Sequence, residues 1–93
     1  MSFNRDSAVQ RAKEDLAERL SISENEIETV SVSEQDFPDM SLGAAVVDEM
    51  SGQMISSGWR INLRTNGKTF EYRADKSQLR LVGFDGTNHV IVS

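Results

Sequence analysis

Near the start of the chain, apolar residues recur at about every fourth position. The positions are Ala8, Ala12, Leu16 and Leu20, flanked by Val9 and Ala17. This period predicts an amphipathic helix over Ser7–Leu20 that turns its charged face to solvent. Ser7 and Gln10 have the spacing of a capping box, so we expect the helix to begin at Ser7. Ser23 and Glu26 repeat that spacing, but only about one helical turn can follow them.

Further along, the period changes from about four to two. Thr29–Ser33 alternates between valine and hydroxyl side chains, which predicts a strand with Val30 and Val32 facing the core. Trp59–Arg64 and Thr69–Ala74 alternate in the same way around Asn66-Gly67, which is the residue pair that a two-residue type I′ turn prefers. Such a loop fixes the register of the hairpin. It places Leu63 opposite Phe70, Ile61 opposite Tyr72 and Trp59 opposite Ala74.

The other face of this hairpin carries polar residues. Arg60 falls opposite Arg73, a pairing of like charges that is unfavourable unless Glu71 lies between them. A second hairpin is predicted between Leu79–Phe84 and His89–Val92, with Asp85-Gly86 as its loop and a bulge at Gly83. A two-residue loop there pairs Leu81 with Val90 and Leu79 with Val92.

These elements predict an α+β fold, in which one N-terminal helix packs on an antiparallel sheet of four or five strands. The whole chain, residues 1–93, is expected to form a single domain. The predicted core consists of Leu16, Leu20, Val30, Ile61, Leu63, Phe70 and Tyr72.

The segment Phe37–Gly58 lacks a clear period. It holds the only proline, three of the six glycines and three of the four methionines. A long irregular stretch in a small domain is often functional. Ala44–Met50 is compatible with a turn of helix, and Gln53–Ser56 with a short edge strand.

Composition narrows the function classes. The chain has 93 residues, no cysteine and a net charge of −5, with 15 acidic and 10 basic side chains. These values exclude disulfides and cysteine-ligated metals, and they disfavour nucleic acid as a partner. No apolar run is long enough to cross a membrane. The first residues lack the apolar core of a signal peptide, so we expect a cytoplasmic location if the chain is full length.

Several stretches resemble a family of small bacterial and archaeal domains without an assigned function. The family pattern combines an LAxRL helix end, an EIEVVSV strand and a (W/F)PDxSLG motif with a tyrosine-rich hairpin. The matching residues are Leu16–Leu20, Ile27–Val32, Phe37–Gly43, Gly58–Ile61 and Phe70–Asp75. Family members often carry Cys-Pro after the motif, whereas this chain has Ala44 and Ala45. The predicted fold also distantly resembles PepSY and cystatin-like domains, and the PepSY resemblance implies binding of a peptide or peptidase.

The candidate site lies in the irregular segment. Pro38 fixes its own φ, Asp39 can accept from amides two residues on, and Gly43 permits a positive φ. We therefore expect an ordered turn that aims an apolar, methionine-rich stretch at a partner. The proposed binding residues are Phe37, Pro38, Asp39, Ser41, Leu42, Gly43, Met50 and Met54.

The function predicted from these patterns is a non-catalytic binding module for a protein or peptide, and a homodimer is compatible with it. The chain has no nucleophile elbow, phosphate loop or histidine pair, so we expect no enzyme activity, metal or cofactor. The alternative is a small ligand-binding or enzymatic domain in which Arg60, Arg64 and Arg73 bind an anion on the sheet face away from the helix. A purely structural subunit is a third possibility. If Val46, Val47, Met50, Met54 and Ile55 were all buried in the monomer core, this stretch could not act as a contact surface for a partner.

Overall fold

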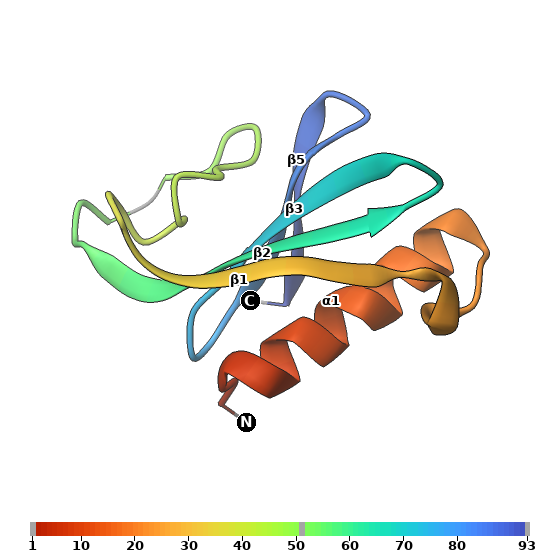
Figure 1. Ribbon diagram of the computed structural model, residues 1–93. Coiled ribbons are helices and arrows are strands. Elements are labelled where there is room, and N and C mark those ends of the chain that lie inside the picture. Colours follow the sequence, from red (N-terminus) through yellow and green to blue (C-terminus); the bar gives the residue numbers. More distant parts are fainter. Residues whose placement is uncertain (1, 51, 93) are drawn as a thin grey trace.

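One helix packs on one face of a five-stranded antiparallel sheet in the computed structural model, which describes residues 2–50 and 52–92 (Figure 1). The elements are α1 (Arg5–Leu20), the 3₁₀ helix η1 (Glu24–Glu26), β1 (Glu28–Phe37), β2 (Ser56–Thr65), β3 (Lys68–Ala74), β4 (Leu79–Phe84) and β5 (Thr87–Val92). The strands lie in the sheet in chain order, so each pairs with the next. The predicted α+β class, with one helix and four to five strands, is confirmed.

The helix begins two residues earlier than predicted. The Asn4 side chain accepts from the Ser7 amide at 2.8 Å, and the Ser7 hydroxyl accepts from the Asn4 amide at 2.9 Å. Ser7 is therefore the third residue of the helix, at the end of the capping box and not at its start. Asparagine caps a helix as well as serine does, and capping at Asn4 adds Arg5 and Asp6 to the predicted helix. The second box is confirmed, because Ser23 and Glu26 cap η1.

The central hairpin has the predicted register. Leu63 pairs with Phe70, Ile61 with Tyr72 and Trp59 with Ala74. Asn66 and Gly67 have φ values of 51° and 74°, the two positive values that a type I′ turn requires.

Val30 corrects the predicted core. The pairing of β1 with β2 shifts between Thr29 and Ser31, so Val30 is the extra residue of a β-bulge. Its side chain is 51% exposed, and its placement in the core was wrong. Val32 lies beyond the bulge, opposite Ile61, and packs against the core as predicted.

The last hairpin is only partly as predicted. Asp85 and Gly86 form its turn, with φ values of 53° and 82°, and the expected bulge at Gly83 is present with φ 66°. The bulge moves Leu81 opposite His89, so the predicted pairing with Val90 was wrong. A second shift between Leu79 and Arg80 compensates, which leaves Leu79 opposite Val92 as predicted.

The core lies between α1 and the sheet. Three small or compact side chains of the helix are fully buried, and they meet a layer from the three central strands. The helix contributes Ala8, Ala12 and Leu16, and the sheet contributes Ile61, Leu63, Tyr72, Leu79 and Leu81. Leu20 and Phe70 are only partly buried. In the described part of the chain, no helix is long and apolar enough to span a membrane.

Candidate functional site

The described residues that connect β1 to β2, 38–50 and 52–55, cross the sheet face opposite α1; we call them the strap (Figure 1). Side chains of later strands donate to its backbone carbonyls. Arg73 donates to Leu42 at 2.9 Å, and Asn88 donates to Ala45 at 2.9 Å. These contacts carry the strap from the β1 edge across β3 and β4 to β5.

The strap begins with a turn held by one carboxylate. Asp39 Oδ1 accepts from the Ser41 hydroxyl at 2.7 Å, from the Ser41 amide at 3.0 Å and from the Gly43 amide at 3.1 Å. The hydrogen bond from the Ser41 hydroxyl, followed by that from the Gly43 amide, lowers the pKa of Asp39. Leu42 has φ 60° and is fully buried, so the turn drives this side chain under the strap. The ordered turn expected from the sequence is present.

An ion pair fixes the middle of the strap. Arg80 of β4 binds both carboxylate oxygens of Glu49, and it also donates to the Ala44 carbonyl at 3.2 Å. The Arg80 side chain is only 6% exposed, whereas that of Glu49 is 23% exposed. The hydrogen bond from Arg80 is the largest cause that lowers the pKa of Glu49.

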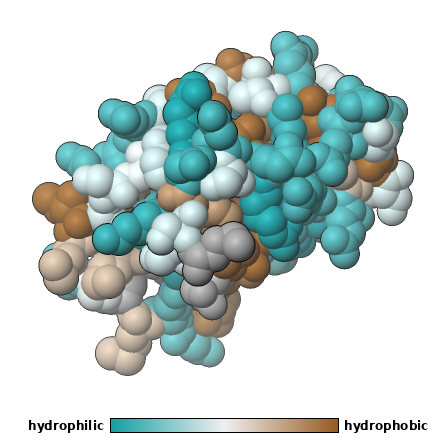
Figure 2. Space-filling view, turned by 90° about the horizontal axis from the view of Figure 1, so that it is seen from below, coloured by the Kyte–Doolittle hydropathy of each residue, from teal (hydrophilic) through white to brown (hydrophobic). Residues whose placement is uncertain are grey.

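Beyond these anchors, the strap turns large apolar side chains to solvent. Val47 is 86% exposed, Met50 98%, Met54 67% and Ile55 72%. We call these four residues the apolar tip. Tan and brown atoms gather at the strap end of the molecule, at the left of Figure 2, while the rest of this face mixes teal and white atoms with scattered brown ones. The hypothesis that this stretch contacts a partner requires its apolar side chains to be exposed, and the four residues of the apolar tip are. Val46, the fifth residue whose burial was to be checked, is partly buried.

The Arg face of the alternative hypothesis is largely engaged within the protein. Glu71 lies between Arg60 and Arg73, and its Oε2 is 3.2 Å from Arg60 Nε and 2.7 Å from Arg73 Nε. It thereby separates the two like charges that the hairpin register places opposite each other. The Arg73 guanidinium also stacks 5.6 Å from the centre of the Phe37 ring. Arg60 and Arg64 are both exposed, and Arg64 lies further along β2. Two of the three guanidinium groups therefore stabilise the strap and the sheet.

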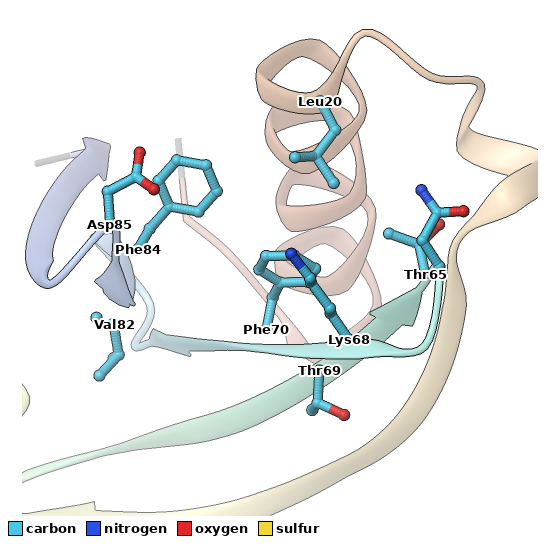
Figure 3. A pocket seen from close by; sticks show the side chains of 10 residues that line it. Leu20, Thr65, Lys68, Thr69, Phe70, Val82, Phe84 and Asp85 are labelled. Atoms are coloured by element: carbon cyan, nitrogen blue, oxygen red, sulfur yellow. The ribbon is translucent and has the colours of Figure 1, made fainter.

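An open hollow of about 550 Å³ lies on the helix side, at the end of α1 (Figure 3). The pairing of β3 with β4 extends only as far as Glu71 and Val82, because the Gly83 bulge turns β4 aside. Leu20 and Phe70 point toward each other across the hollow, with Phe84 beside them and Lys68 at the rim. The Phe70 and Phe84 ring centres are 6.1 Å apart.

The predicted site residues fall into two groups. The motif from Phe37 to Gly43 forms the base of the strap, where Phe37, Ser41 and Leu42 are buried. Met50 and Met54 lie in its exposed part. The ends of the segment thought irregular belong to strands, since β1 runs to Phe37 and β2 begins at Ser56. Of Ala44–Met50, Val46–Glu49 forms a hydrogen-bonded turn, and none of it is helix.

Sequence reasoning missed the residues that hold the strap from outside. Arg80, Gln78 and Asn88 come from the second half of the chain, and Gln78 reaches the Met40 carbonyl at 2.7 Å. One feature of the sequence was informative. Arg80 stands between Leu79 and Leu81, so strand alternation already placed it on the face away from the helix.

A family model for a domain of unknown function, DUF8738, matches residues 9–82. The chain belongs to this family. The match runs from the first turns of α1 to β4, so it includes the motif, the strap and the Arg80 anchor. Neither the curated proteins nor the solved structures gave a match to this chain.

Proposed function

We propose that this DUF8738 domain is a non-catalytic interaction module that contacts a protein partner through the apolar tip of the strap. The observation that carries the proposal is the combination of a fixed base and exposed apolar side chains. Val47, Met50, Met54 and Ile55 are each more than half exposed. Exposed apolar clusters of this kind mark contact surfaces, and methionine adapts its shape to a partner.

The anchoring of the strap supports the same proposal. Binding by a flexible loop costs conformational entropy, whereas a loop already held in place avoids most of that cost. The Asp39 turn and the Arg80–Glu49 pair hold the strap on both sides of Ser41–Val46. The distant resemblance of the predicted fold to PepSY and cystatin-like domains implies a peptide or peptidase as partner, by analogy of fold alone.

Site-specific photocrosslinking tests the proposal. A benzophenone side chain at position 54 should capture a protein from native lysate, and the same probe at Glu14, on the exposed side of α1, should not. Binding of the captured protein should then fall with Met50→Ser/Met54→Ser. Lys13→Ser/Glu14→Ser on the helix is the matched control. Equal capture at both positions, or equal binding by both double variants, would contradict the proposal.

The hollow of Figure 3 favours a second candidate function, the binding of a small apolar or aromatic ligand. Its aromatic floor suits such a ligand better than the Arg face suits an anion, because Arg60 and Arg73 are paired with Glu71. A fragment screen by NMR separates the two candidates. Ligands that shift the ring resonances of Phe70 and Phe84, and not the Met54 methyl, would favour this second function.

A further inference from the structure

The outer edge of β1 is a long strand edge that the described part of the protein leaves uncovered. β1 is the first strand of the sheet and pairs only with β2. Apart from Val32 and Phe37, its residues are exposed. Among the described residues, no backbone hydrogen bond beyond the sheet pairing reaches Glu28–Phe37. Every second residue of such an edge directs its N–H and C=O groups outward, where an added strand can pair with them.

The bulge and the proline limit the usable part of this edge. The bulge at Val30 disrupts the first part of β1, and Pro38 ends it. Ser31–Phe37 remains as a regular stretch, paired with β2 from Asn62 to Ser56. Seven residues of regular edge are enough for an extended peptide to add as a sixth strand.

The charge on this edge disfavours a second copy of the same chain. Antiparallel pairing of the whole stretch Ser31–Phe37 with itself places Glu34 opposite Glu34. Like charges directly opposite each other destabilise a strand pair, and each copy carries a net charge of −5. The edge therefore selects against self-pairing and favours a strand of opposite charge.

The side chains next to the edge indicate which residues that strand carries. Glu34 and Asp36 are two positions apart, so they lie on the same face of β1. They border a hollow of about 300 Å³ that is also lined by Ser57 and Trp59, and Trp59 is the residue opposite Glu34. A lysine or arginine there meets two carboxylates and lies beside the Trp59 side chain, which is a favourable setting for a cation.

We propose that the β1 edge binds an extended peptide segment with Lys or Arg at alternate positions, which adds to the sheet as a sixth strand beside Ser31–Phe37. This site is separate from the apolar tip and goes beyond the proposed function. The partner's backbone supplies the strand pairing, and its basic side chains supply selectivity through Glu34, Asp36 and Trp59.

Trp59 is the only tryptophan and it lines this hollow, so its fluorescence can report binding there. We would titrate the protein with an acetylated, amidated nonapeptide in which Lys and Thr alternate, at physiological salt. A saturable change in Trp59 emission is expected, together with slowed amide exchange within Ser31–Phe37. The same peptide with its internal amides N-methylated keeps its charges but cannot donate to a strand, and it should not bind.

Two variants with the same net charge complete the test. Glu34→Gln/Asp36→Asn should weaken binding by about tenfold, because two exposed ion pairs are lost. Glu14→Gln/Glu18→Gln, on the exposed face of α1, should bind as the parent does. Equal binding of the N-methylated peptide would overturn strand addition in favour of general charge attraction. Equal loss in both variants, or no binding of the parent peptide, would also overturn the proposal.

Discussion

Replacing Arg80 by methionine removes the ion pair that holds the middle of the strap, while the new side chain still fills the space of the arginine's aliphatic stem. In the parent protein, Arg80 binds Glu49 at both oxygens and donates to the carbonyl of Ala44. The variant leaves both partners without this cation, on a face where the Arg80 side chain is only 6% exposed. Water would have to reach the Glu49 carboxylate and the Ala44 carbonyl, or the strap would lift from the sheet.

The size of the loss follows from how deeply the pair is buried. Breaking a fully buried ion pair costs ~3–5 kcal/mol, but water reaches Glu49 more easily than Arg80, so we expect a smaller cost of ~2–3 kcal/mol. Arg60→Met is the matched control, because its ion pair with Glu71 is 44% exposed on the arginine side and Glu71 keeps Arg73. Exposed pairs contribute about 0–1 kcal/mol.

Urea denaturation followed by Trp59 fluorescence and far-UV circular dichroism measures both losses. Glu49→Gln and the double variant complete a cycle, in which we expect a coupling energy of ~1–2 kcal/mol between Arg80 and Glu49. Amide exchange at Ala44 and Val46 shows whether the strap lifts locally. Equal losses for the Arg80 and Arg60 variants, with unchanged exchange in the strap, would refute the reasoning.

Three further predictions use the same denaturation assay. Leu16→Ala should cost ~2–5 kcal/mol because its side chain is fully buried, whereas Val30→Ala on the exposed bulge should cost less than ~1 kcal/mol; similar values would misplace the core. Gly58→Ala should fail to fold or lose most of its stability, since a Cβ there would lie 2.0 Å from a backbone carbonyl oxygen of β3; near-parent stability would contradict this packing. The pKa values of Asp39 and Glu49 lie below their ordinary 3.8 and 4.5, so their contribution to the free energy of unfolding is complete above pH 4.5 and is lost as the pH falls through the lowered values. Asp39→Asn/Glu49→Gln should therefore weaken the loss of stability in acid. A variant that loses stability in acid as the parent does would contradict this prediction.

Local patterns were sufficient for most of the fold. The type I′ turn at Asn66-Gly67 fixes the register of its hairpin, and strand alternation then places every residue on the right face. The pattern failed where an extra residue enters a strand. Nothing in Thr29–Ser33 shows that Val30 is a bulge, because the bulge depends on how β1 pairs with a distant strand.

The turn at the base of the candidate site and the exposed apolar stretch were predictable from the sequence, but the anchors that hold the strap were not. The residues of the Asp39 turn bond to one another within a few positions, so their chemistry is local and readable. Arg80 and Asn88 lie more than thirty residues along the chain from the strap carbonyls that they bind, so these contacts depend on the order of the strands. Sequence periodicity gives a strand's faces, but it does not say which loop covers the outer face.

The most direct test of the central claim uses the methionine methyl groups. Protein labelled with ¹³C at these methyls, with Glu14→Met added as an exposed reference on α1, is compared in buffer and in native lysate or with a captured partner. If the apolar tip is the contact surface, the signals of Met50 and Met54 should shift or broaden while that of residue 14 stays sharp. Unchanged Met50 and Met54 signals, or equal broadening at all three positions, would contradict the account.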